Sequence, residues 1–443
     1  LTGLRSLGGD RYAVSAEAGA LLADLQRALR EWIFTDSATW DADSLVLLDA
    51  LRGQPFFFPP DPTETSASVG GMIACNASGA HTFRYGPTRP YVSAVTVVLA
   101  NGDILSLKRG EHCFDANGRA VIQWPDGHET VLQAPGFTQP ATKNAAGYYA
   151  GPNMDLVDLF IGSEGTLGMV TEADLQVVPP TETCSAAVLF FATESAALSF
   201  VERARQQRQE LGLEALEYMD AGALRFLRDS RARNGAISGV PECLPPDADC
   251  AIYLDLGVPE AGLHDALAGI AALAAESGSE PDACWSAHDR AERERLRLFR
   301  HALPEAVNHH IATIRRHHPS LTKLGTDMAV PDDRLREIIH LYRSELDRAN
   351  LDYVIFGHIG DNHLHVNILP TTPAQYDAGK ALYLAFAEAV VKMGGSPAAE
   401  HGIGKLKTVF LELLVGRDGV AEMRALRNAL DPDNRLGRGT LFE

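Results

Sequence analysis

The stretch Gly-His-Ile-Gly-Asp-Asn-His-Leu-His-Val-Asn at residues 357–367 carries three histidines between two apolar segments. The apolar segments are typical of short β-strands, so the sequence predicts a hairpin here. Because side chains alternate along a strand, His365 and Asn367 are expected to share one face. A tight glycine turn is expected to fold His358, just past the first strand, back beside His365.

A second polar stretch, Glu-His-Gly-Ile-Gly-Lys at residues 400–405, adds a carboxylate and a fourth imidazole. Divalent metals bind imidazole nitrogen and carboxylate oxygen, and catalytic sites keep a position open for substrate. The two stretches therefore favour a metal site of the catalytic kind.

Size and charge limit the class of protein. At 443 residues the chain is too long for one hydrophobic core, so two domains are expected. The net charge of -19 argues against a nucleic-acid partner, whose phosphates it would repel. The six cysteines lack the CxxC spacing of zinc ribbons and iron–sulfur clusters, so reduced thiols are expected.

The pattern of elements changes at Pro179-Pro180, the candidate domain boundary. Before it come short strands, glycine turns and an amphipathic helix over 16–32. After it, strands alternate with helices, as in an α+β domain whose sheet is covered on one face. Asp332 and Asp333 are expected to cap one helix. The expected strands are 92–99, 104–107, 186–191, 251–256, 353–356 and 364–369, and the expected helices are 194–211, 261–275, 332–350 and 374–393.

Two loops rich in small residues occur in the first part of the chain. The first covers 68–79 and is followed by Tyr85-Gly86, and the second covers 159–170. Small side chains let backbone amides approach phosphate oxygens closely. A structural turn explains either loop taken alone, whereas two such loops in one domain favour a large phosphate-bearing cofactor.

These loops resemble the FAD-binding domain of the vanillyl-alcohol oxidase / p-cresol methylhydroxylase (VAO/PCMH) flavoprotein family. The stretches at 357–367 and 400–405 resemble its D-2-hydroxyacid dehydrogenase branch, which includes D-lactate dehydrogenase, the glycolate oxidase flavin subunit and D-2-hydroxyglutarate dehydrogenase. Four separated motifs occur in the family's order over nearly the whole chain.

The resemblance implies an α+β fold with a partial FAD-binding domain over 1–180. It implies an FAD-linked oxidase C-terminal domain over 181–395, a substrate (cap) domain with an antiparallel sheet covered by helices. A segment returning to the flavin site is expected over 396–443. The family's first FAD subdomain, which carries a glycine-rich pyrophosphate loop, is expected to precede Leu1 and is missing from this sequence.

The resemblance also implies site residues. The implied metal ligands, which suit Zn, Mn or Fe, are His358, His365 and Glu400. The implied catalytic and substrate-contacting residues are His401, Arg300, Lys323 and Asn367. The implied FAD-contacting residues are Ser68, Gly70, Gly71, Asn76, Ser78, Gly79, Tyr85, Gly86, Glu164, Gly165, Gly168 and Val170.

The chemistry of a 2-hydroxyacid agrees with these roles. Arg300 and Lys323 offer cations for its carboxylate. His401 is the natural base for the hydroxyl proton as the C2 hydrogen leaves as hydride to the flavin, and a metal would lower the pKa of that hydroxyl. Pro304 replaces a hydroxyl residue that some 2-hydroxyglutarate enzymes place one turn after the arginine, which favours a smaller substrate.

Some of these residues also have a plain structural interpretation. Arg300 lies in the charge-dense segment 290–300, where most arginines are solvated helix surface, and Lys323 precedes a turn where exposed lysines are common. His363 stands where the family usually has asparagine, and of two interpretations, an extra polar contact and loop variation, we favour loop variation. The histidines within 309–318 are interpreted as surface residues.

The resulting hypothesis is an FAD-dependent dehydrogenase that oxidises a small D-2-hydroxyacid of the D-lactate or glycolate type. A cytochrome, a quinone or an electron-transferring flavoprotein is the expected electron acceptor. The alternatives are an oxygen-using flavin oxidase and a non-catalytic relative or subunit that needs a partner to complete the FAD site. The sequence fits a cytoplasmic protein, and it is compatible with a peripheral position at a membrane and with a homodimer.

Overall fold

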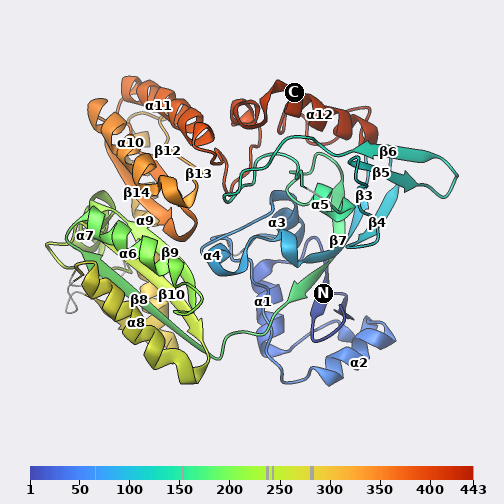
Figure 1. Ribbon diagram of the computed structural model, residues 1–443, viewed down its shortest axis with the longest axis horizontal. Coiled ribbons are helices and arrows are strands. Elements are labelled where there is room, and N and C mark those ends of the chain that lie inside the picture. The colour runs from blue at the N-terminus through green and yellow to red at the C-terminus, as the bar shows by residue number, and fades with distance from the viewer. Residues whose placement is uncertain (65, 152–153, 236–238, 242–243, 280–283, 443) are drawn as a thin grey trace. The chain divides into compact units, whose positions relative to one another are not determined.

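The computed structural model describes residues 1–64, 66–151, 154–235, 239–241, 244–279 and 284–442. These residues form two compact units, each with its own antiparallel sheet (Figure 1). The first unit consists of 1–180 together with 396–443, and the second consists of 181–395.

The sheet of the first unit has five strands in the order β1-β2-β7-β3-β4. Helices α3 and α5 pack against it, and α12, broken at Gly416 where φ is +72°, contacts the separate hairpin β5–β6. The elements are β1 (Gly3–Ser6), β2 (Tyr12–Glu17), α1 (Leu22–Glu31), α2 (Ala42–Ala50), α3 (Val69–Cys75), α4 (Thr82–Tyr85), β3 (Val92–Val98), β4 (Ile104–Lys108), β5 (Arg119–Gln123), β6 (Glu129–Gln133), α5 (Leu156–Phe160), β7 (Met169–Val177) and α12 (Thr408–Leu430).

Local sequence explains most of this unit. The strands expected at 92–99 and 104–107 are β3 and β4, which pair so that Val98 is opposite Ile104. The helix expected over 16–32 is shorter than predicted, because residues up to Glu17 pair in the sheet as β2. The amphipathic pattern is present, with Leu22, Leu25 and Leu29 on the buried side, whereas Leu21 is exposed.

The sheet of the second unit runs in the order β11-β8-β10-β9-β14-β15-β12, and β13 also pairs with β15. The elements are β8 (Thr183–Phe191), α6 (Glu194–Gln206), β9 (Leu213–Met219), α7 (Ala221–Asn234), β10 (Cys250–Val258), α8 (Leu263–Glu276), β11 (Trp285–Ala287), α9 (Arg290–Arg315), β12 (Leu324–Gly325), β13 (Met328–Ala329), α10 (Leu335–Arg348), β14 (Tyr353–His358), β15 (His363–Ile368) and α11 (Pro373–Lys392).

Helices cover both faces of this sheet, so the expectation of one covered face is wrong. On one face, Leu227 of α7 and Phe299 of α9 join Val188 of β8 in a buried core. On the other face, Phe200 of α6 meets Phe191 of β8 with ring centroids 5.7 Å apart. Successive residues of β8 point to opposite faces and are all buried from Ser185 onward, which is why this strand is a continuous apolar run instead of an alternating one.

The expected helix caps at Asp332 and Asp333 are also wrong. These residues form a 3-10 turn, η6 (Asp332–Arg334), and the residue before α10 is Arg334, whose side chain makes no capping bond. Asp332 Oδ1 instead accepts a hydrogen bond of 2.8 Å from Asn362 Nδ2, a tertiary contact that local sequence does not reveal.

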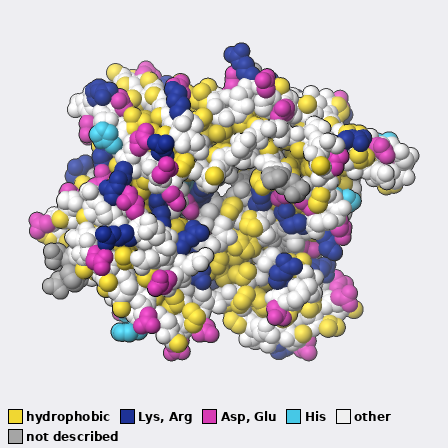
Figure 2. Space-filling view, in the orientation of Figure 1, with side chains coloured by type: hydrophobic (Ala, Val, Ile, Leu, Met, Phe, Trp, Pro, Cys, Tyr) yellow, Lys and Arg dark blue, Asp and Glu magenta, His cyan; other side chains and the backbone are white. Residues whose placement is uncertain are grey.

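The surface fits the composition. Acidic and basic side chains are interspersed over the face shown in Figure 2. Within the part of the chain that the structure describes, no helix combines the length and apolarity needed to cross a membrane. The described cysteines are free thiols, and Cys243 lies outside the described residues.

The histidines expected at the surface are mostly there. His309, His317 and His318 are exposed. His310 is half-buried, with its ring edge-on to Phe226 at a centroid distance of 5.2 Å.

Candidate metal and substrate site

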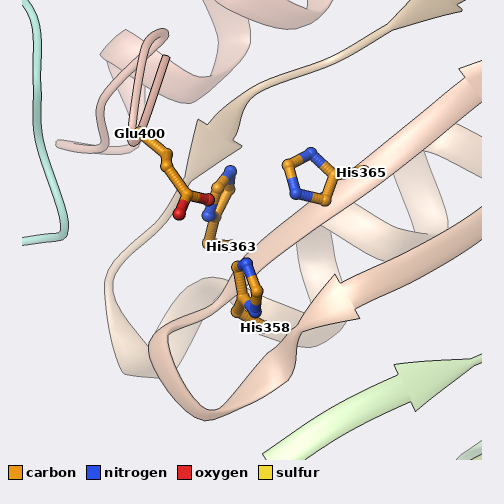
Figure 3. Close-up of side chains that lie close together, drawn as sticks. All are labelled: His358, His363, His365 and Glu400. Carbon is orange, nitrogen blue, oxygen red and sulfur yellow. The ribbon is translucent and has the colours of Figure 1, made fainter. Parts of the chain in front are cut away.

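Three imidazoles lie together on one face of the second unit's sheet, on the hairpin formed by β14 and β15 (Figure 3). The register sets His358 directly opposite His363, and Phe356 opposite His365. Residues that are directly opposite, or two apart on one strand, share a face. The candidate ligand nitrogens of the three rings all lie within 4.8 Å of one another.

The hairpin differs from the expected one at both ends of its turn. His358 is the last residue of β14, rather than a residue just past it, and the turn η7 (Ile359–Asp361) follows. β15 begins at His363, whose side chain is 0% exposed, so the interpretation of this residue as loop variation is wrong. Asn362, with φ +51°, takes the left-handed position that ends the turn.

Each imidazole has an acceptor beside one of its ring nitrogens. Nδ1 of His358 lies 2.6 Å from Oε1 of Glu217 on β9. Nδ1 of His365 lies 2.9 Å from the backbone oxygen of Thr326, and Nε2 of His363 lies 3.0 Å from Oδ1 of Asp327.

This pattern fits a metal. An acceptor that holds the proton of one ring nitrogen leaves the lone pair of the other nitrogen to bind a cation, and metal-binding histidines usually have such a partner. For His358 and His365 the metal-binding atom would be Nε2. The sequence did not indicate that Glu217, Thr326 and Asp327 are the partners of these histidines. The local signal was the presence of two acidic residues, Glu214 and Glu217, inside the buried strand β9, because a buried carboxylate needs a partner.

A guanidinium from another element fixes the turn between the histidines. Arg205 of α6 donates from one terminal nitrogen to the backbone oxygen of Ile359 and to Oδ1 of Asn362. Its other terminal nitrogen lies 3.6 Å from Oδ1 of Asp332, which also accepts from Asn362. Two charged side chains, Arg205 and Asp332, therefore hold the turn that joins β14 to β15.

Gly357 is required for the same geometry. Its φ is +133°, and a Cβ there would lie 2.9 Å from Cδ2 of His365. Any other residue would push the imidazole out of place.

Arg300 approaches this face from helix α9. Its Nε lies 3.3 Å from Oε2 of Glu217, and the two side chains are 17% and 6% exposed. The solvated-surface interpretation of Arg300 is therefore wrong. One buried carboxylate contacts both the arginine and the His358 imidazole.

Asn367 and Lys323 lie near the same hairpin. Asn367 is buried two residues beyond His365 and is opposite Gly325 of β12. Lys323 directly precedes β12, and burial lowers the pKa of its ammonium group. In the second unit, one hairpin therefore carries His358, His365 and Asn367, and Arg300 lies beside it. Lys323 lies directly before the adjoining strand β12.

Glu400 and His401 lie in the first unit, before α12. Their segment is anchored by Glu164, whose carboxylate oxygens accept bonds of 2.7 Å from the amides of Ile403 and Gly404. Glu400 itself lies 3.6 Å from Lys143 Nζ. Glu400 is counted among the candidate metal ligands because of the resemblance described above.

The expected FAD residues all belong to the first unit. Ser68 caps α3 by accepting a bond of 3.2 Å from the Gly71 amide, and Asn76 ends α3 in the left-handed conformation. Gly79 packs so closely that a Cβ would lie 2.0 Å from the backbone oxygen of Asp61. Part of this glycine-rich loop is therefore explained by packing.

Other features of the loop fit a cofactor. The Ser78 hydroxyl is buried and has no hydrogen-bond partner among the described residues. Such groups normally have one, so a bound molecule that supplies a partner fits here. The second loop has Glu164 and Gly165 in left-handed conformations, with φ of +53° and +69°, and the Glu164 amide donates a bond of 2.8 Å to the backbone oxygen of Ala74, which ties the two loops together.

Comparison with solved structures identifies the fold. 4-Ethylphenol oxidase from Gulosibacter chungangensis matches with a TM-score of 0.59 at 16% identity, over 97% of this chain and 76% of that chain. Alkyldihydroxyacetonephosphate synthase matches with a TM-score of 0.54 at 14% identity, over 91% of this chain and 62% of that chain. The expected VAO/PCMH-type α+β flavoprotein fold is confirmed.

Family models give the finer assignment. The model "FAD linked oxidases, C-terminal domain" matches residues 180–441, and the model "FAD binding domain" matches residues 45–108. The chain belongs to the FAD-linked oxidase family.

Curated relatives are consistent with this family. Glycolate oxidase subunit GlcD of Bacillus subtilis is 28% identical over 90% of this chain and 73% of its own length. D-2-hydroxyglutarate dehydrogenase of Xanthomonas citri is 30% identical over 89% of this chain and 73% of its own length. The probable mitochondrial D-lactate dehydrogenase of Danio rerio is 27% identical over 89% and 68%. All three names denote oxidoreductases.

The contact between Glu217 and His358 generates a prediction. Replacing Glu217 by Gln removes the charge that favours the Nδ1 proton of His358, so zinc affinity should fall by about 10–100-fold. Competition with a chromophoric chelator measures this. Glu214→Gln is the matched control, because Glu214 is a buried glutamate on the same strand with its hydroxyl partner at Thr181. If Glu217→Gln and Glu214→Gln bind zinc with equal affinity, Glu217 does not support His358 as a metal ligand.

Proposed function

We propose that the protein uses FAD and a divalent metal to oxidise a small D-2-hydroxyacid, of the D-lactate or glycolate type, to the 2-oxoacid. The observation that carries the proposal is the chain of contacts from Arg300 through Glu217 to His358. These contacts connect the Arg300 guanidinium, which is suited to bind a carboxylate, with the His358 imidazole, which is suited to bind a metal. The names of the curated relatives support the same class of substrate.

Arg300 would hold the substrate carboxylate. A guanidinium presents its N–H donors in a planar fork that matches the two oxygens of a carboxylate. Lys323 would add a second cation, and the amide of Asn367 would offer a hydrogen bond to a polar substrate atom.

His401 would take the proton of the substrate hydroxyl. As the C–H bond at C2 breaks, its electron pair leaves with the hydrogen as hydride, and the electron pair of the O–H bond forms the new carbonyl. Bound FAD supplies the hydride acceptor, and a cytochrome, a quinone or an electron-transferring flavoprotein would receive the electrons afterwards. His358, His365 and Glu400, the ligands that the family resemblance implies, would hold a divalent metal, and its positive charge would lower the pKa of the hydroxyl.

Binding of FAD is the first test of this proposal. The purified chain should keep FAD through gel filtration and show the absorbance of bound flavin. The buried Ser78 hydroxyl and the two glycine-rich loops are the reason to expect binding. A colourless protein that takes up no added FAD would instead support a non-catalytic relative, or a subunit that needs a partner. In the flavin-containing protein, release of peroxide during turnover would identify an oxidase in place of a dehydrogenase.

The role of His401 generates a second test. His401→Ala should lower turnover by about 10²–10⁴-fold, because a general base contributes on that order. The absorbance of bound flavin should stay unchanged, which separates loss of the base from loss of the cofactor. Steady-state reduction of an artificial acceptor measures turnover. A variant with unchanged turnover would remove His401 from the mechanism.

The lowered pKa of Lys323 generates a prediction about pH. A lysine that binds the substrate carboxylate works in its charged form, and burial lowers its pKa below 10.5. KM should therefore rise as the pH rises through this lowered pKa. In Lys323→Arg the guanidinium stays charged, so KM should stay flat to higher pH.

Lys380→Arg is the control for this experiment, because Lys380 is an exposed lysine paired with Asp377. In this variant, KM should rise at alkaline pH as it does in the wild type. If KM also rises in this way in Lys323→Arg, Lys323 does not bind the substrate.

A further inference from the structure

We propose that His363 is a third imidazole ligand of the metal, so that this chain carries a three-histidine centre on the hairpin of β14 and β15. The inference rests on the proposed function, because it concerns the same metal. It goes beyond the ligands that the family resemblance implies, which are His358, His365 and Glu400. His363 stands where the family usually has asparagine, so the third imidazole is a property of this chain.

The hairpin brings the three rings together by its register alone. His363 is directly opposite His358 and two residues before His365 on one strand. The centroid of its ring lies 5.4 Å from that of His358 and 4.4 Å from that of His365. His358 and His365 are 5.7 Å apart by the same measure, so His363 is closer to each of the other two than they are to each other. A metal near the rings of His358 and His365 is therefore near the ring of His363 as well.

The surroundings of His363 suit a ligand. Its ring is fully buried, and Oδ1 of Asp327 lies 3.0 Å from its Nε2. A carboxylate at this distance attracts a proton to Nε2, and Nδ1 would then offer its lone pair to a cation, as at many metal-binding histidines. Asp327 is itself buried, between β12 and β13, two short strands that pair with β15. The imidazole is thus held on the same rigid sheet as its two neighbours.

A plain structural role for the His363–Asp327 pair explains only one ring nitrogen. Asp327 would give the buried His363 ring a polar partner wherever that ring lay in the protein. The pair gives no reason for three imidazoles to converge on one face with candidate ligand nitrogens within 4.8 Å. If each imidazole proton points to the acceptor beside it, the other ring nitrogens have only lone pairs, and a cation would give each of these nitrogens a partner.

A third nitrogen ligand changes which metal is preferred. Imidazole suits Zn²⁺, and carboxylate with water suits Mn²⁺. A site with three imidazoles should therefore favour Zn²⁺ over Mn²⁺ more strongly than a site with two. His363→Asn, which restores the family's usual residue, should lower that preference.

The experiment uses the full chain stripped of metal by a chelator. Affinities for Zn²⁺ and for Mn²⁺ are measured by competition with a chromophoric chelator, and pulsed electron paramagnetic resonance of the Cu²⁺-loaded protein counts the bound imidazoles. We expect three imidazoles in the wild type and two in His363→Asn. The zinc affinity of this variant should fall at least about tenfold, on the scale of changes around metal ligands, and its manganese affinity should change less.

Three further variants make the result decisive. His317→Asn replaces an exposed histidine and should leave both affinities unchanged. Asp327→Asn keeps the ring but removes its carboxylate, and should weaken zinc binding by about 10–100-fold. His358→Ala tests the site as a whole. If His358→Ala loses zinc while His363→Asn and Asp327→Asn bind it as the wild type does, His363 is not a ligand. If none of these variants changes zinc affinity, the metal site itself is wrong, and the role of His363 with it.

Discussion

The antiparallel pairing of β14 with β15 is the constraint on which the candidate site depends. It sets His358 opposite His363 and leaves His365 on the same face. A slip of one residue would turn a strand's side chains to the opposite face, because the side-chain period of a strand is two. The left-handed Asn362 within the turn, and the contacts that Arg205 makes with the turn from α6, fix this register.

The charges around the imidazoles form a second constraint. Glu217 and Asp327 are both buried, and a buried carboxylate is unfavourable unless it is paired. Arg300 pairs with one of them, and His363 lies beside the other. A divalent cation among the rings would bring positive charge close to these two carboxylates, which is an electrostatic reason, separate from ligand geometry, for the site to attract one.

The sequence predicted the elements better than the contacts between them. Alternation along 364–369 was enough to place His365 and Asn367 on one face of a strand. His363 was misjudged because the turn ends at Asn362, and a shift of one residue decides between loop and strand. Such boundaries depend on tertiary contacts, here the clamp from Arg205 in α6.

The partners of the histidines were out of reach for a related reason. Glu217 meets His358 only because β9 is hydrogen-bonded to β14, which follows it by more than a hundred residues in the chain. Arg300 looked like a surface residue because its neighbours on α9 are charged, and only packing of that helix on the sheet shows which side of it is buried. The sheet covered on both faces was missed for the same reason, since a continuous apolar run is also compatible with other arrangements.

The clamp on the turn has a consequence for conformational entropy. A free loop between two histidines would have to be ordered when a ligand binds, at a cost of about 1–2 kcal/mol for each residue fixed. In this chain Arg205 and Asp332 already hold that turn in the folded protein. The ordering therefore belongs to the folding of the second unit, and a ligand that reaches the imidazoles meets side chains whose backbone is already fixed.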